Sequence, residues 1–381
     1  MKYRIVYCIP SLHLVGGMER ALTLKANYFS DIKGYQITII TTDGGEFEPF
    51  FPLSPKIEVI NLNINFEKYI KYPLYLKSLV YINNQRIFKS KLKQILYRIR
   101  PHYTITMLRR EINFINSIDD GSIKIGEMQF NYLNYRKISK IPLSNLISKI
   151  WLNQFTHKIE KLKCLVVLSE RDCLNYPKRE NIVVIPNPIK SIPLNQCNYE
   201  SKKVIAAGRF SKQKGFDLLL QSWKIVSKEF PDWTLSIYGQ GEKDEYITYI
   251  KNNNLESNCF IYEQSENIEE KICDSSIFAF SSRFEGFSLM LTEAMACGAA
   301  TVSYDCNYGP REIIQNNISG LLIEPENTEQ FADGLTKLMS DITLRDSLGN
   351  RARERAKEFT IEKISEKWIE LFQSLDKKVI N

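Results

Sequence analysis

The stretch IFAFSSRFEGFSLMLTEAMACGAATVSYD, residues 277–305, contains two short apolar runs separated by a loop and a helical segment. The runs 277–281 and 300–304 have the length and the aromatic or β-branched content of buried strands. Ser288 has the chemistry of an N-cap, and we expect it to begin a helix that continues to Ala296. A strand, a helix and a second strand in this order indicate parallel strands in an α/β domain.

The same alternation runs through nearly the whole chain. Strands are predicted at 3–9, 36–42, 57–62, 103–108, 123–129, 164–169 and 182–185, and then at 203–208, 234–239, 259–263, 277–281, 300–304 and 320–324. Three helices, at about 327–340, 342–357 and 361–375, are expected to close the chain. A chain of 381 residues is long for one core, so we predict two doubly wound, Rossmann-like domains.

The boundary between these domains is expected in IPNPIKSIPLNQ, residues 185–196, where three prolines interrupt the rhythm. This predicted boundary assigns residues 1–188 to the first domain and residues 189–360 to the second. Ligands of doubly wound sheets bind at the carboxyl ends of the strands, and two such domains facing each other would enclose a central cleft. The loops that follow strands are therefore the places to search for chemistry.

The composition is that of a globular protein, with 44% hydrophobic and 25% charged residues. No run approaches the roughly 18 apolar residues of a membrane span, and the apolar core before Pro10 is too short for a signal peptide. We expect a cytoplasmic protein, peripheral on the inner face of the cell membrane at most. The eight cysteines form no CxxC pair and are expected to be reduced, buried thiols.

Charge is distributed unevenly along the chain. Residues 1–190 contain 29 Lys and Arg against 15 Asp and Glu, whereas residues 191–381 contain 22 against 29. The basic region 68–110 includes the segment 72–101, which is predicted to form one or two helices that mix Leu, Ile and Tyr with Lys and Arg. This face is either simply solvated or binds an anionic membrane surface. Nucleic acid is not expected, because no recognition motif accompanies the charge.

The two carboxylates of the opening stretch lie in different settings. Glu285 is expected in the loop before the helix, and Glu293 on the second turn of the helix, so they are not equivalent partners. Each would bind a different part of a long ligand, with the amides of Gly286, Phe287 and Ser288 between them. A carboxylate among apolar neighbours needs donors, and a ribose diol would satisfy Glu293 through both oxygens.

Three other loops at strand ends carry candidate residues. Arg209 and Lys214 flank a turn after strand 203–208 and suit a diphosphate, although two solvated cations are the alternative. Gly239 lies in a tight turn after strand 234–239. Gly16 and Gly17 precede a helix whose free amides favour an anion, although a plain turn would use the same residues.

Taken together, these motifs resemble glycosyltransferase family 4, the retaining sugar-nucleotide transferases of the GT-B fold. The matching pieces are GGxE at 16–19, PNP at 186–188, GRFxxxKG at 208–215, the glutamate pair Glu285 and Glu293, AMACG at 294–298, YGPREII at 308–314 and SGLLI at 319–323. The likeness covers nearly all of the second half and is looser over the first. The YGPREII form is similar to that of bacterial polysaccharide and oligosaccharide assembly enzymes that use UDP-hexoses or UDP-N-acetylhexosamines.

The resemblance implies roles for individual residues. Arg209, Lys214 and Glu285 would be the catalytic residues, with the two cations on the donor diphosphate and Glu285 on the sugar hydroxyls. Glu293 would bind the ribose. Further substrate-binding positions implied by the family are Gly16, Gly17, Gln129, Asn187, Gly239, Tyr262, Gly286, Phe287, Ser288 and Leu289. The first domain would bind the acceptor, with the helix at about 361–381 packed back on it, and the second would bind the nucleotide sugar.

Gln129 occupies the place where many relatives carry a histidine that reaches toward the donor sugar, and an amide cannot carry charge. No DxD motif occurs in the chain, and Arg209 and Lys214 can neutralise the phosphates, so no metal cofactor is expected. The family resemblance implies front-side displacement, in which the leaving phosphate takes the proton of the acceptor.

The leading hypothesis is a retaining, metal-independent glycosyltransferase. It would move a hexose or N-acetylhexosamine from a nucleotide sugar, expected to be UDP-linked, to a glycan or a polyprenyl-diphosphate-linked acceptor in surface polysaccharide synthesis. A UDP-sugar 2-epimerase of the same fold is one alternative. A catalytically impaired relative that binds sugar nucleotides is the other.

Overall fold

A computed structural model describes residues 2–69, 73–130, 132 and 144–380. The chain divides into two compact units, of which unit 1 comprises Met1–Pro186 and Ser365–Asn381, and unit 2 comprises Asn187–Ile364. The first crossing between units falls inside the proline-rich segment that was expected to hold the boundary. The second falls within α12 (Ile361–Ile380), after Ile364.

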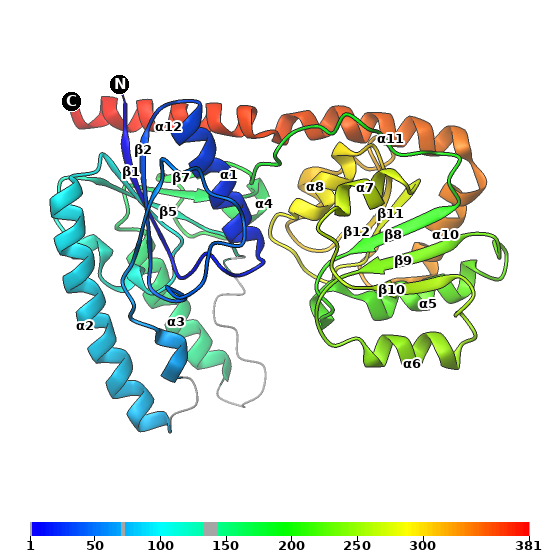
Figure 1. Cartoon of the computed structure of the whole chain (residues 1–381), viewed down its shortest axis with the longest axis horizontal. Helices are drawn as coiled ribbons and strands as arrows, with labels where there is room; N and C mark the ends of the chain where they lie inside the picture. Colours follow the sequence, from blue (N-terminus) through cyan, green and yellow to red (C-terminus); the bar gives the residue numbers. More distant parts are fainter. Residues whose placement is uncertain (1, 70–72, 131, 133–143, 381) are drawn as a thin grey trace. The chain divides into compact units, whose positions relative to one another are not determined.

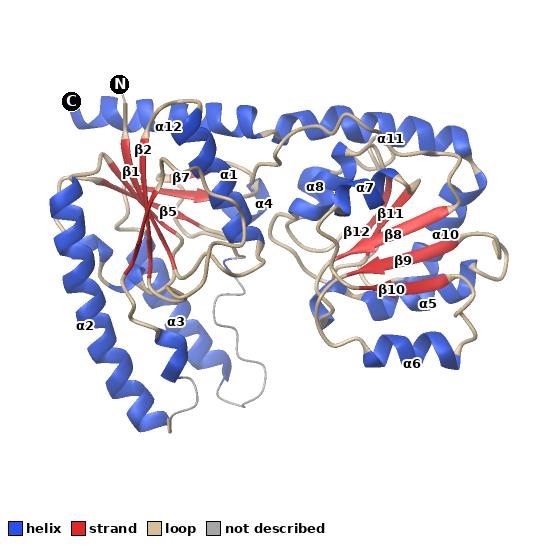
Figure 2. Ribbon diagram, in the orientation of Figure 1, coloured by secondary structure: helices blue, strands red, loops and turns tan. Residues whose placement is uncertain are grey.

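Unit 1 is built on a seven-stranded parallel sheet with the order β3-β2-β1-β4-β5-β6-β7 (Figures 1 and 2). The order reverses beside β1, as in a doubly wound fold. The strands are β1 (Arg4–Ile9), β2 (Gln36–Thr41), β3 (Glu58–Asn61), β4 (Tyr103–Thr106), β5 (Ile123–Glu127), β6 (Cys164–Val167) and β7 (Ile182–Val184). The helices before α12 are α1 (Gly17–Asp31), η1 (Phe66–Tyr69), α2 (Leu74–Ile99), η2 (Glu111–Asn113), η3 (Ile115–Ser117), α3 (Ser144–Ile159) and α4 (Glu170–Cys173).

Helices cover both faces of this sheet. Phe88 of α2 and Phe155 of α3 belong to one buried cluster with Val6 of β1. On the other face α12 packs against the start of the strands, where Phe372 stacks on Tyr103 with ring centroids 4.4 Å apart. Figure 1 shows α12 passing across this end of the sheet. The C-terminal segment is therefore part of the core of unit 1.

Unit 2 contains a six-stranded parallel sheet with the order β10-β9-β8-β11-β12-β13. Its strands are β8 (Lys203–Ala207), β9 (Thr234–Tyr238), β10 (Cys259–Tyr262), β11 (Ile277–Phe280), β12 (Ala300–Tyr304) and β13 (Leu321–Ile323). Its helices are η5 (Lys212–Lys214), α5 (Phe216–Val226), α6 (Asp244–Asn252), α7 (Ile268–Cys273), α8 (Leu289–Ala296), α9 (Pro310–Ile313), α10 (Thr328–Ser340), α11 (Ile342–Ala356) and η6 (Lys357–Phe359). Trp223 of α5 and Phe331 of α10 are fully buried in its core.

The predicted α/β class with two doubly wound domains is confirmed, and every predicted strand overlaps an observed one. Most predicted strands end one or two residues too late, and the extra residues lie in the loops that follow the strands. Residues 70–72, which include Lys71 of the predicted basic region, lie outside the described residues. Of the helices that the structure describes, none is long and apolar enough to cross a membrane.

Candidate functional site

The centre of the candidate site in unit 2 is an ion pair between loops that follow two adjacent strands. Lys214, after β8, places its Nζ 2.6 Å from Oε1 of Glu285, after β11. The Ser282 hydroxyl donates to the same oxygen at 2.9 Å. The two side chains are 18% and 9% exposed, so a cation and a carboxylate meet in a partly desolvated place at the carboxyl edge of the sheet.

Backbone contacts hold these two loops together. Gly215 has φ +64°, and a Cβ at this position would lie only 2.1 Å from the carbonyl oxygen of Ser281. The Ser281 hydroxyl in turn donates to the Lys214 carbonyl at 2.9 Å. Any side chain at 215 would push the loops apart, and the Lys214–Glu285 pair depends on their closeness.

Arg283 ties the same loops through its side chain, and the sequence reasoning missed it. Its guanidinium donates two hydrogen bonds of 2.7 Å to the carboxylate of Asp217, and a further one of 2.9 Å to the Lys212 carbonyl. Burial pushes the pKa of Asp217 upward, but the Arg283 bonds outweigh it and the net pKa lies below its ordinary value. The feature of the sequence that could have identified Arg283 is its position two residues before Glu285.

Arg209 and Gly239 have different settings. Arg209 is exposed, and it forms no ion pair within the part of the chain that the structure describes, so its fork is open to an anion. Gly239 is in close contact with the loop after β8, where an added Cβ would lie 1.9 Å from the Gly208 carbonyl oxygen. Close packing alone therefore explains why residue 239 is a glycine.

Helix α8 begins as expected. The Ser288 hydroxyl accepts a hydrogen bond from the Leu291 amide at 3.3 Å and caps the helix, and Glu293 follows on the second turn, half-buried. The Phe287 and Leu289 side chains are buried, so these residues can meet a ligand only through their backbone. At Gly286 a Cβ would meet open space, which leaves room for a ligand beside the backbone.

An aromatic pair lies at the carboxyl ends of β9 and β10. Tyr262, 42% exposed, stacks on Tyr238 with centroids 4.8 Å apart and an interplanar angle of 18°. Burial, together with the neighbouring Tyr262, raises the pKa of Tyr238. A half-exposed ring at this edge can hold a flat base by stacking.

In unit 1 the predicted glycines lie at the start of α1. Gly16 is its N-cap, and a Cβ there would lie 2.1 Å from Oε2 of Glu19, which is buried in the first turn. Gly17, the first helical residue, is exposed. Asn187 is 3% exposed, so its amide is turned into the protein.

Gln129 follows β5 and is held by a buried ion pair. Its Nε2 donates to Oε1 of Glu127 at 2.6 Å, and the ammonium of Lys25 contacts the same oxygen. Lys25 and Glu127 are each 1% exposed, and the Lys25 ammonium lies 4.8 Å from the ring centre of Trp368 in α12. Burial lowers the pKa of Lys25. The Gln129 amide nitrogen has two N–H donors, and the bond to Glu127 uses one of them.

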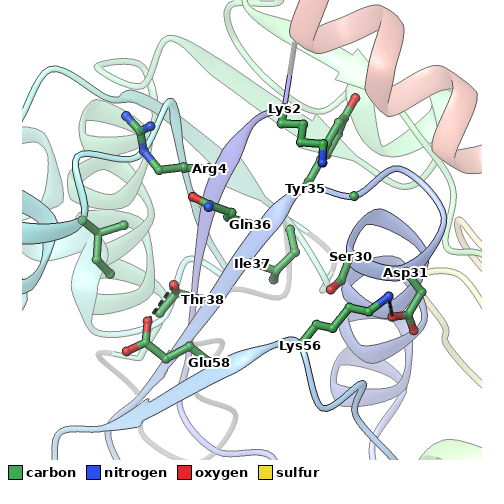
Figure 3. Close-up of a pocket in the computed structure, with 12 residues that line it drawn as sticks. Lys2, Arg4, Ser30, Asp31, Tyr35, Gln36, Ile37, Thr38, Lys56 and Glu58 are labelled. Atoms are coloured by element: carbon green, nitrogen blue, oxygen red, sulfur yellow. Dashed lines mark hydrogen bonds and ion pairs between the residues drawn. The ribbon is translucent and has the colours of Figure 1, made fainter.

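A hollow in unit 1 is lined by Lys2, Arg4, Lys56 and their neighbours (Figure 3). It lies at the amino ends of β1, β2 and β3, opposite to the edge where parallel sheets bind ligands. Nζ of Lys56 lies 3.3 Å from Oδ1 of Asp31, so one of the three cations that line the hollow is already paired with a carboxylate. A substrate site is not expected at this edge of the sheet.

The family model for "Glycosyl transferases group 1" matches residues 193–355. A Campylobacter jejuni protein is 30% identical over 280 residues, which are 71% of this chain and 73% of the relative. It is named N-acetylgalactosamine-N,N'-diacetylbacillosaminyl-diphospho-undecaprenol 4-alpha-N-acetylgalactosaminyltransferase. This chain belongs to the group 1 glycosyltransferases.

One further relative and two solved structures of similar fold cover nearly the whole chain. An amylovoran biosynthesis glycosyltransferase of Erwinia amylovora is 26% identical over 96% of this chain and 98% of its own. Sucrose-phosphate synthase of Thermosynechococcus elongatus has a TM-score of 0.81 at 16% identity, covering 99% of this chain and all of the other. HepE of Anabaena, solved with UDP-glucose, has a TM-score of 0.75 at 16% identity. The match covers 98% of this chain and 100% of the HepE chain. The protein is a glycosyltransferase with the two-domain GT-B fold.

Proposed function

We propose that this glycosyltransferase moves a hexose or N-acetylhexosamine, with retention and without a metal cofactor, from a UDP-sugar. The acceptor in this proposal is a glycan or polyprenyl-diphosphate-linked sugar of surface polysaccharide synthesis. The observation that carries the proposal is the Lys214–Glu285 pair at the carboxyl edge of the unit 2 sheet.

The pair provides two functions side by side. An ammonium has three N–H donors, so Lys214 can keep one on Glu285 and direct another to a phosphate. Negative charge grows on the β-phosphate as the glycosidic bond breaks, and a fixed cation nearby stabilises that change. Glu285 would use its remaining lone pairs for sugar hydroxyls, and the exposed Arg209 would supply a second cation. These two cations are the reason for proposing that no metal is needed.

The remaining residues of unit 2 fit the rest of a UDP-sugar. Tyr262 offers its half-exposed ring to a uracil, and Glu293 offers a carboxylate to the ribose hydroxyls. HepE was solved with UDP-glucose, and the Campylobacter relative is named for a lipid diphosphate acceptor, which supports these classes of donor and acceptor.

A lipid-linked acceptor requires approach to a membrane, and α2 of unit 1 has a suitable face. Leu79 and Ile82 are 65% and 51% exposed, and Arg86, Lys93 and Tyr97 follow at helical spacing on the same side. Apolar residues interleaved with cations fit the surface of an anionic bilayer. Each cation near that surface contributes about 1 kcal/mol, so several suffice for reversible attachment.

UDP release tests the proposal directly. The enzyme is mixed with a panel of UDP-hexoses and UDP-N-acetylhexosamines and a short polyprenyl-diphosphate glycan, with and without EDTA. We expect acceptor-dependent UDP release that EDTA leaves intact, and a product whose new linkage keeps the anomeric configuration of the donor. UDP binding without release from any donor would identify an impaired relative. Isomerisation of the free UDP-sugar would identify an epimerase.

A further inference from the structure

We propose that Cys273 is a reactive thiol that accepts oxidative modification, and that Cys197 or Cys297 resolves it as a disulfide. The three residues come from the segment before β8, the end of α7 and the end of α8, all within unit 2. The proposal is independent of the sugars that the enzyme uses.

Short contacts bring the three cysteines together. The Cys197 amide donates to the Cys297 carbonyl at 2.9 Å. The Cys197 sulfur lies 3.1 Å from the carbonyl oxygen of Ile272, the residue before Cys273. The Cys273 sulfur lies 3.6 Å from the carbonyl oxygen of Asn195, two residues before Cys197. Residues far apart in sequence thus form one thiol cluster, defined as Cys197, Cys273 and Cys297.

A cation adjoins the thiol cluster. Arg353 of α11 donates to the carbonyl oxygens of Asn195 and Ala296, each at 3.1 Å, and these residues neighbour two of the cysteines. A guanidinium keeps its charge at any physiological pH, so it favours a thiolate nearby.

Exposure selects the cysteine that ionises. Cys197 and Cys297 are buried, whereas Cys273 is half-buried and reaches solvent. Hydrogen bonds from Cys197 and then Cys297, aided by Arg353, lower the pKa of Cys273 against the effect of its burial. The carbonyls of Ile272 and Glu269 are competing acceptors for the buried thiols, at 3.1 and 3.9 Å, but a charged sulfur is the stronger acceptor.

The chemistry requires only a peroxide. The Cys273 thiolate attacks one oxygen of hydrogen peroxide, the O–O bond breaks and hydroxide leaves, so sulfur is oxidised to sulfenic acid and the peroxide is reduced. The sulfur of a neighbouring thiol then attacks, an S–S bond forms and the S–O bond breaks. The proton of that thiol and the departing hydroxide leave as water.

Cys173 provides an internal control. It is also half-buried, but burial and the neighbouring Glu170 raise its pKa, so it should react slowly. At pH 7 we expect trace iodoacetamide to alkylate Cys273 about tenfold faster than Cys173 in the intact native chain, read by peptide mass spectrometry. The ordinary thiol is only a few per cent ionised at this pH, and the lower nucleophilicity of an acidic thiolate offsets part of the gain. Equal rates, or faster labelling of Cys173, would overturn the assignment.

Peroxide tests the second step. Treatment of the native protein with hydrogen peroxide should yield a disulfide between Cys273 and Cys197 or Cys297, reversed by dithiothreitol. The Cys273→Ser variant should lose this disulfide, whereas Cys173→Ser should keep it, and circular dichroism checks that both fold. Overoxidation of Cys273 with no disulfide, or no oxidation at Cys273, would show that the thiol cluster has no resolving function.

Discussion

Replacing Lys214 by alanine should affect turnover and stability together, because one ammonium is placed to serve both. Its partner Glu285 is 9% exposed and would be left without a cation. Breaking a fully buried pair costs about 3–5 kcal/mol and losing an exposed pair costs about 0–1 kcal/mol, so this partly buried pair should cost about 2 kcal/mol. Losing one preorganised donor to the leaving phosphate should lower kcat about 100-fold, equivalent to about 2.7 kcal/mol.

The two effects can be separated with a second change. Glu285→Gln in the Lys214→Ala background removes the uncompensated charge, so it should recover part of the stability while turnover stays low. Lys212→Ala is the matched control, since its side chain is exposed on the same 3-10 helix and we expect neither effect. Urea unfolding gives the stability of each variant, and initial rates of UDP release give kcat.

Turnover of Lys214→Ala within twofold of the parent would refute the phosphate role. Unchanged unfolding in the same variant would show that the ion pair does not stabilise unit 2. A double variant that regained full activity would mean that Lys214 acts only by neutralising Glu285, and that no cation at this position touches the donor.

Three further outcomes are expected. Glu293→Gln should weaken UDP binding in calorimetry by about 1–3 kcal/mol while the fold is kept, and unchanged affinity would argue against the ribose role. Asp217 has a lowered pKa in the folded state, so its contribution to stability is present above its unfolded pKa of about 3.9 and is lost as the pH falls below it. Asp217→Asn should therefore reduce the loss of unfolding free energy as the pH falls below about 3.9, and an identical pH profile would show that the Arg283 bonds are not formed in solution. Changing Arg86 and Lys93 to Glu should reduce sedimentation with anionic liposomes at low salt, and parent protein that stays in the supernatant would rule out the membrane face.

The strands and the start of α8 could be predicted from sequence because their signals are local. The strand Ile277–Phe280 is apolar at every position, and burial on both faces of a parallel sheet demands that pattern. Ser288 caps its helix through a bond to a residue three positions later, so a short window contains the whole cause.

The contacts that assemble the site are non-local, and no window of sequence contains them. Lys214 and Glu285 are 71 residues apart, and Lys25 and Glu127 are 102 apart. Arg283 was missed for the same reason, since its partner Asp217 is reached only after β8 and β11 pair.

The sequence by itself determined the fold class, the loops that carry chemistry and the residue types available for binding a charged ligand. The tertiary structure alone decided how those residues are paired: that Lys214 meets Glu285, that Gln129 donates to Glu127, and that three scattered cysteines converge. The reason is physical. Strand and helix formation follow from side-chain periodicity within a few residues, whereas a side chain's partner depends on which strands lie next to each other in the sheet.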